Sequence, residues 1–119
     1  MIQKFEVQGV QHDDKLRTYV NRKLGGLDRY ISRHSRASAH AEVHLKETKR
    51  TKTKDHCHCE VTLYLPHQTI IVKESALNMY AAVDIVEAKL KLQLKKYKDL
   101  HESGKMHRHL MARLRRRGS

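Results

Sequence analysis

Strict alternation of apolar and polar side chains in two stretches most constrains how this chain can fold. Every second residue is apolar within residues 37–46, and residues 56–65 repeat the pattern. Successive side chains of a strand point to opposite faces of a sheet, so this alternation predicts two strands with one buried face each. Residues 2–8, which alternate in part, and the β-branched residues 69–73 predict two further, shorter strands.

Two other stretches carry apolar residues at spacings of three and four, which is the period of a helix. The first covers residues 14–31, with Asp13 as the expected N-cap and a glycine pair near the end. The second covers residues 79–101, with Asn78 as the expected N-cap. The order is therefore β-α-β-β-β-α. Each element buries one face if two helices pack on one face of a four-stranded sheet, so we expect this α+β fold.

The charge of the chain limits its partners. The 119 residues include 25 Lys and Arg against 13 Asp and Glu, a net charge of +12. We expect one folded domain over residues 1–101 and a basic, flexible tail over residues 102–119. A sequence pI near 10.0 on a small domain points to a polyanion. Nucleic acid is the first candidate and an anionic membrane the second; the alternative is a surface that is merely soluble.

Two classes of protein are disfavoured by what the sequence lacks. No apolar run has the length of a membrane helix, and the first residues do not resemble a signal peptide. Two cysteines do not make a disulfide framework, so we expect a cytoplasmic protein.

The segment His-Cys-His-Cys at residues 56–59 invites a zinc interpretation. On a strand the two cysteines would face one side and the two histidines the other, so they could not converge on one ion. We therefore expect no metal and no cofactor, and we interpret Cys57 and Cys59 as core residues. Asp84 and Glu87 are explained by the helix dipole, and no phosphate loop or nucleophile elbow is present, so we expect no enzyme and no small-molecule substrate.

The polar face of the two alternating strands is rich in histidine. It is either an ordinary polar surface, which we favour, or a face that gains charge in acid and strengthens RNA binding. Its expected members are His40, Glu42, His44, His56, His58 and Glu60.

Two motifs at opposite ends of the domain carry a family resemblance. The first lies within residues 10–31 and consists of Leu16, Arg17, Val20, Lys23 and Leu24. The second lies within residues 78–99 and consists of Met79, Tyr80, Ala82, Val83, Asp84, Lys89, Leu90, Gln93, Leu94, Lys96 and Lys98. Together they resemble the short ribosome hibernation promoting factors and the related ribosome-associated inhibitor A, or factor Y. Asn78 and Leu92 depart from this pattern, which usually has Asp and often Arg there.

The resemblance covers residues 1–101 and implies a non-enzymatic factor that binds the small ribosomal subunit and its rRNA. Such factors occupy the decoding region, overlap the mRNA and tRNA sites and keep ribosomes inactive in stress or stationary phase. We expect the free protein to be monomeric. The basic tail matches neither the tailless nor the acidic-tailed members. A general double-stranded RNA-binding module is the alternative, although that domain lacks the first strand and carries its basic patch at the start of its second helix.

The basic residues of the two helices supply the expected RNA contacts. At about 100° per residue they fall beside or opposite the apolar stripes, so adjacent helices would form one basic surface for phosphates. The alternative is a solvated helix face. The expected RNA-binding residues are Arg22, Lys23, Arg29, Lys89, Lys91, Lys95, Lys96 and Lys98, and possible further contacts in the tail are Arg108, Arg113, Arg115, Arg116 and Arg117.

Overall fold

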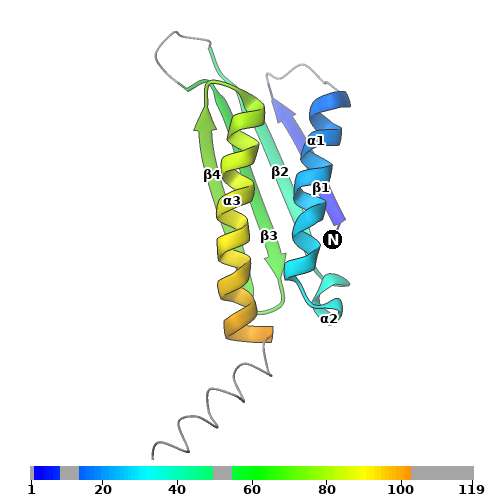
Figure 1. Cartoon of the computed structure of the whole chain (residues 1–119). Helices are drawn as coiled ribbons and strands as arrows, with labels where there is room; N and C mark the ends of the chain where they lie inside the picture. The colour runs from blue at the N-terminus through cyan, green and yellow to red at the C-terminus, as the bar shows by residue number, and fades with distance from the viewer. Residues whose placement is uncertain (1, 9–13, 50–54, 103–119) are drawn as a thin grey trace, which may run out of the picture.

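The computed structural model describes residues 2–8, 14–49 and 55–102 (Figure 1). In chain order the elements are β1 (Ile2–Gln8), α1 (Asp14–Gly25), a 3₁₀ segment η1 (Gly26–Tyr30), α2 (Arg33–Arg36), β2 (His40–Glu47), β3 (Cys57–Leu65), β4 (Gln68–Ala76), α3 (Met79–Tyr97) and a π-helical segment η2 (Lys98–Glu102). The expected cap at Asp13, most of the expected basic loop and the tail from residue 103 onwards lie outside the described residues.

The sheet has the order β1-β2-β3-β4. Strands β2, β3 and β4 form an antiparallel meander, in which Val43 lies opposite Val61 and Val61 lies opposite Val72. Strand β1 pairs with β2 in parallel, because α1 carries the chain back to the starting end of the sheet before β2 begins. The class is therefore α+β, as expected.

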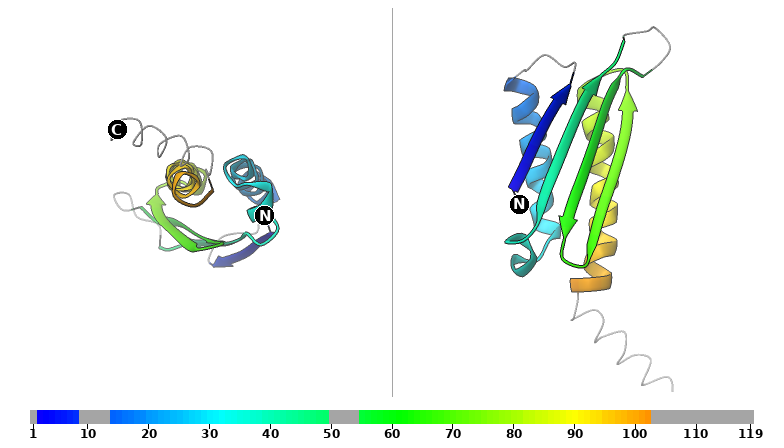
Figure 2. Two further views of the ribbon diagram at one scale, coloured as in Figure 1. Left: turned by 90° about the horizontal axis from the view of Figure 1, so that it is seen from below. Right: turned by 180° about the vertical axis from the view of Figure 1, so that it is seen from behind.

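Helices α1 and α3 lie side by side on one face of the sheet and leave the other face open (Figure 2). Their apolar stripes turn toward the inward residues of the strands, so that Val20, Val86 and Leu90 are completely buried. Tyr97 is also core, and its hydroxyl donates to the Pro66 carbonyl oxygen at 2.6 Å. Among the described helices, none has the length and apolar character needed to cross a bilayer.

Several boundaries differ from those expected. Helix α1 ends at Gly25, and the chain continues to Tyr30 as a 3₁₀ segment, because two consecutive glycines weaken an α-helix. Residues 37–39 are not in β2, because the chain turns there after α2: the amides of Ser38 and Ala39 donate to the Ser35 carbonyl oxygen, and Ala37 is exposed. Strand β4 extends to Ala76, beyond the expected residues 69–73. Asn78 is the N-cap of α3, as expected, and its side chain accepts from the amide of Tyr80.

The polar face of the sheet lacks one of its expected members. His56 was expected to face outward, but it precedes the first residue of β3, so strand alternation does not set its direction and its side chain is buried.

Candidate nucleic-acid interface

Tyr30, at the end of η1, has three cations around its ring. The Arg29 Cζ lies 5.7 Å from the ring centroid, and the Nζ atoms of Lys91 and Lys95 lie 5.6 and 6.0 Å from it. These distances suit cation–π attraction, which holds the three charges together despite their mutual repulsion. Arg29 is fixed further because its Nε donates to the Gly26 carbonyl oxygen at 3.2 Å. Residues of η1 and α3 therefore form one positively charged cluster around Tyr30.

A groove of about 290 Å³ runs beside this cluster, between the α1–η1 segment and α3. Glu87 is the acidic residue that borders it. The groove is lined by Arg22, Lys23, Gly26, Leu27, Arg29, Tyr30, Glu87 and Lys91. Four of these eight side chains are cationic, so an anionic group is the natural occupant.

Tyr19 of α1 makes a second set of contacts between α1 and α3. Its ring packs edge to face against Tyr80 with the centroids 4.9 Å apart, which joins α1 to α3. The Arg22 Cζ and the Lys23 Nζ lie 5.4 and 5.5 Å from the Tyr19 centroid. The tyrosine hydroxyl donates to Asp84, and this hydrogen bond raises the pKa of Tyr19.

Lys23 has a structural partner as well as a place in the groove. Its Nζ lies 3.4 Å from Asp84 and 3.7 Å from Glu87, and the charge of Glu87 is the main cause of its raised pKa. The two carboxylates therefore bind α1 to α3. The sequence suggested the helix dipole as the reason for Asp84 and Glu87 in α3, but these ion pairs with Lys23 are a second reason.

The lysines of α3 divide between two flanks. Lys91 and Lys95 turn toward Tyr30, whereas Lys89 forms an ion pair with Glu74 of β4 on the other side of the helix. Lys96 follows Lys89 by seven residues and shares its flank. Lys98 lies beyond the end of α3, in η2. Seven of the eight expected residues are exposed and Lys23 is half-buried, but only Arg22, Lys23, Arg29, Lys91 and Lys95 gather at the groove and at the Tyr19 and Tyr30 rings.

The histidines of the open sheet face make local contacts. The His40 ring stacks on Tyr64 with the centroids 4.5 Å apart, and His58 Nδ1 lies 2.6 Å from the Ser75 hydroxyl. Tyr64 donates to Glu42 at 3.3 Å, and burial is the main cause of its raised pKa. These contacts are those of an ordinary polar strand surface.

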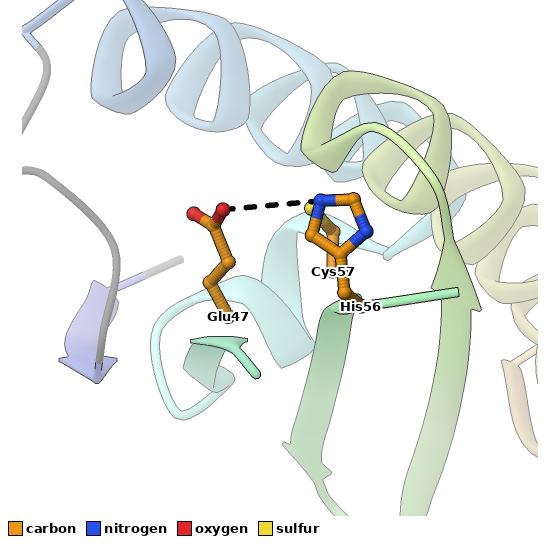
Figure 3. A group of neighbouring side chains, drawn as sticks. All are labelled: Glu47, His56 and Cys57. Carbon is orange, nitrogen blue, oxygen red and sulfur yellow. Dashed lines mark ion pairs between the residues drawn. The ribbon is translucent and has the colours of Figure 1, made fainter. Parts of the chain in front are cut away.

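The sequence prediction missed two features. The first is the cation–π contact of Tyr30, for which the neighbouring Arg29 was the signal in the sequence. The second feature is a group of three potential metal ligands, Glu47, His56 and Cys57, at one end of β2 and β3 (Figure 3). The alternation argument separated His56 from Cys57, but His56 lies outside the strand.

Comparisons with known proteins agree with this fold. The chain is 34% identical over 97 residues to the ribosome hibernation promotion factor of Lactococcus lactis and 33% identical over 97 residues to that of Staphylococcus aureus. Each alignment covers 80% of this chain, against 49% and 48% of the two relatives. The chain therefore spans about half the length of these curated relatives.

Two solved structures are similar over most of the domain. The N-terminal domain of Thermus thermophilus Protein Y has a TM-score of 0.68 and 28% identity, covering 82% of this chain and 99% of that one. A ribosomal subunit interface protein from Coxiella burnetii has a TM-score of 0.59 and 29% identity, covering 82% and 98%. The family model described as Sigma 54 modulation protein / S30EA ribosomal protein matches residues 4–101. The chain belongs to this family.

Proposed function

We propose that this protein is a ribosome hibernation factor. It binds rRNA of the small ribosomal subunit in the decoding region, blocks the mRNA and tRNA sites by occupying them, and thereby inhibits translation in the cytoplasm under stress or in stationary phase. The basic surface of α1, η1 and α3 is the binding face. Its proposed contacts are Arg22, Lys23, Arg29, Lys89, Lys91, Lys95, Lys96 and Lys98.

The observation that carries this proposal is the convergence of Arg29, Lys91 and Lys95 on Tyr30, beside a groove lined by further cations. Guanidinium and ammonium groups bind phosphates, and a half-exposed aromatic ring offers a base a surface to stack on. The names of the relatives, which include ribosome hibernation promotion factor and ribosomal subunit interface protein, support the ribosome as the source of that RNA.

Lys91 and Lys95 are the residues whose replacement tests the proposal most directly. The double variant Lys91→Glu/Lys95→Glu places two negative charges beside Tyr30 and should reduce co-sedimentation with vacant small subunits at least tenfold. Lys89→Glu/Lys96→Glu, on the other flank of α3, should weaken binding less, because Lys89 is already neutralised in part by Glu74. Circular dichroism should show native folding for both variants, since all four side chains are exposed.

Lys46→Glu/Lys73→Glu is the matched control, since it makes the same change of net charge on the open sheet face. Lys46 lies opposite His58 and Lys73 opposite Glu60, both in β3, and both lysines are exposed. This control should bind small subunits like the unmodified chain, and mRNA or tRNA bound beforehand should exclude both proteins. Equal losses in the control and in Lys91→Glu/Lys95→Glu would contradict the binding face. If the unmodified chain bound free duplex RNA as tightly as it binds small subunits, a general double-stranded RNA-binding module would be favoured.

A further inference from the structure

A small group of metal-binding side chains lies at the end of β2 and β3, away from the basic groove. Glu47 is the last residue of β2 and lies directly opposite Cys57, the first residue of β3. Residues directly opposite each other in an antiparallel pair project to the same face of the sheet. The inward direction of Leu45 and Cys59 therefore continues to Glu47 and Cys57.

His56 completes the group from just outside the strand. The end of β2 and the start of β3 are held together here, because the Thr48 amide donates to the His56 carbonyl oxygen at 2.8 Å. The His56 ring turns toward the other two side chains, with Nε2 3.9 Å from Glu47 Oε1 (Figure 3). The carboxylate oxygen, the imidazole nitrogen and the Cys57 Sγ all lie within 4.8 Å of one another.

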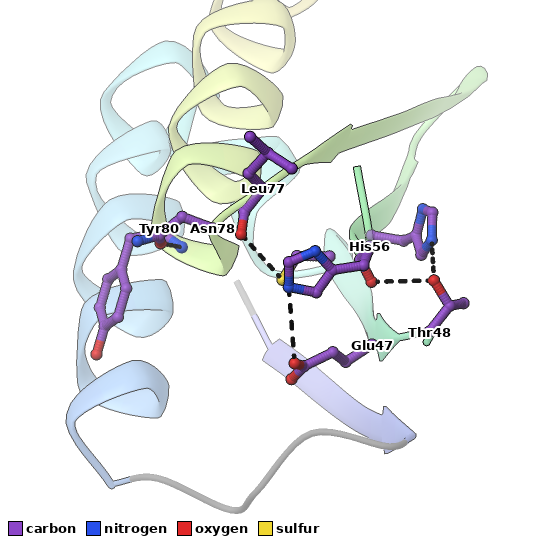
Figure 4. A network of polar contacts seen from close by, with 8 residues as sticks. Glu47, Thr48, His56, Leu77, Asn78 and Tyr80 are labelled. Atoms are coloured by element: carbon purple, nitrogen blue, oxygen red, sulfur yellow. Dashed lines mark hydrogen bonds and ion pairs between the residues drawn. The ribbon is translucent and has the colours of Figure 1, made fainter. Parts of the chain in front are cut away.

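The bonding of His56 distinguishes this group from a chance cluster. Its side chain is only 8% exposed, and Nε2, the nitrogen that faces Glu47 and Cys57, lies too far from the carboxylate for a hydrogen bond. Nδ1, on the opposite side of the ring, has no hydrogen-bond partner. Buried imidazole nitrogens are normally paired, since an unpaired one loses its hydration without compensation. Cys57 Sγ lies 3.9 Å from the Leu77 carbonyl oxygen, a distance that permits only a weak contact (Figure 4).

The geometry points to a zinc-binding site formed by Glu47, His56 and Cys57. Thiolate, imidazole and carboxylate are the three ligand types that Zn²⁺ takes, with bonds of about 2.0–2.3 Å. Tetrahedral coordination then needs ligand atoms roughly 3.3–3.8 Å apart. The observed separations, which extend up to 4.8 Å, exceed this range by at most about 1.5 Å, and the half-exposed Glu47 side chain has room to move. The fourth position is open to water or to a ligand from a partner.

Cobalt and zinc titrations of the reduced full chain test this site. After metals are stripped with a chelator, one equivalent of Co²⁺ should give the absorption of a thiolate-to-cobalt charge transfer. Zn²⁺ should displace the cobalt, and the loss of the cobalt absorption during this competition gives the Zn²⁺ affinity. Glu47→Gln, His56→Gln and Cys57→Ser should each weaken Zn²⁺ binding at least tenfold, and Cys57→Ser should also abolish the thiolate band.

The neighbouring positions supply matched controls. Cys59→Ser and His58→Ala change the same residue types two residues further along the chain and should retain the thiolate band and the Zn²⁺ affinity. Circular dichroism in the presence of chelator checks the folding of each variant. If substitution of the buried His56 or Cys57 unfolds the chain, Glu47→Gln still tests the site, because the Glu47 side chain is half-exposed. The zinc site is disproved if the unmodified chain shows no thiolate band. The assignment is equally wrong if Glu47→Gln leaves the Zn²⁺ affinity unchanged, or if Cys59→Ser loses the band as Cys57→Ser does.

Discussion

The thiol of Cys59 illustrates how the core controls a single titratable group. It is 1% exposed on the inward face of β3, and burial raises the pKa of this thiol to about 12, with the charge of Glu60 adding to the effect. The ordinary value is 9.0. Because the folded pKa is the higher one, the neutral thiol stabilises the fold below about pH 9. That stability is lost as the pH rises toward 12, at up to about 1.4 kcal/mol per pH unit.

Alkylation of Cys59 should consequently report unfolding. In the Cys57→Ser variant, in which Cys59 is the remaining cysteine, iodoacetamide at pH 8 should react at least a hundredfold more slowly with native than with denatured protein. Mass spectrometry of quenched samples gives the two rates. Native and denatured rates within tenfold of each other would mean that the β3 core opens freely.

At the scale of elements, two consecutive glycines, Gly25 and Gly26, lie at the junction between α1 and η1. Gly25 has φ −60° and ψ −34°, which is ordinary right-handed helix, and a Cβ added there would meet no atom within 4 Å. Neither backbone conformation nor space therefore requires glycine at this position. It contributes mainly freedom to the unfolded chain, which folding must remove.

Gly25→Ala should stabilise the protein by about 0.5–1 kcal/mol and raise its melting temperature by roughly 2–8 °C. Thermal unfolding followed by circular dichroism measures the change. Ala88→Gly, at an exposed position in the middle of α3, should have the opposite sign, with a cost of about 1 kcal/mol. A lower melting temperature for Gly25→Ala would show that this glycine has a structural requirement.

The elements themselves were largely predictable from the sequence, because burial of one face imposes a period on each strand and helix. The alternation of residues 56–65 identified β3, and the stripe ending at Tyr97 identified α3. Side-chain direction at element ends was not predictable. His56 is one residue outside β3, and that single step places its ring in the core beside Glu47 instead of on the open face.

The candidate surface was predictable in composition but not in arrangement. A helical wheel shows that Lys89 and Lys91 fall on different flanks of α3, but not what lies beside each flank. Only the packed structure brings Glu74 to Lys89 and Tyr30 to Lys91. The sequence also could not place Lys23 between Asp84 and Glu87, because these residues meet through contact of α1 with α3.

For the whole molecule, the tail is a separate source of positive charge. Residues 102–119 contain six Lys and Arg and one Glu, and this Glu102 is the last residue of η2. We propose that the arginines of this segment add phosphate contacts to those of the basic groove. A tail that only adds solubility is the alternative.

Removal of residues 103–119 should therefore lower the salt dependence of ribosome binding. The slope of log affinity against log salt should fall by about 0.7–0.9 for each phosphate that the tail neutralises in the full-length chain. Co-sedimentation across a salt series gives the slopes. A full-length variant with lysine in place of Arg108, Arg113, Arg115, Arg116 and Arg117 should keep the original slope, because its charge is unchanged. Identical slopes for the truncated and full-length chains would show that the tail binds no phosphate.

The packing of both helices on one face of the sheet also affects how the molecule orients during diffusion toward a partner. Cations gather on the helix side around Tyr30, whereas Lys46 and Lys73 on the open sheet face are balanced by Glu42 and Glu60. Among the described residues, positive charge is therefore in excess on the helix side, which gives this part of the domain an electric dipole directed from sheet to helices. In the field of a polyanion such a body rotates until its helices lead, so diffusional encounters are already oriented, and most strongly at low ionic strength.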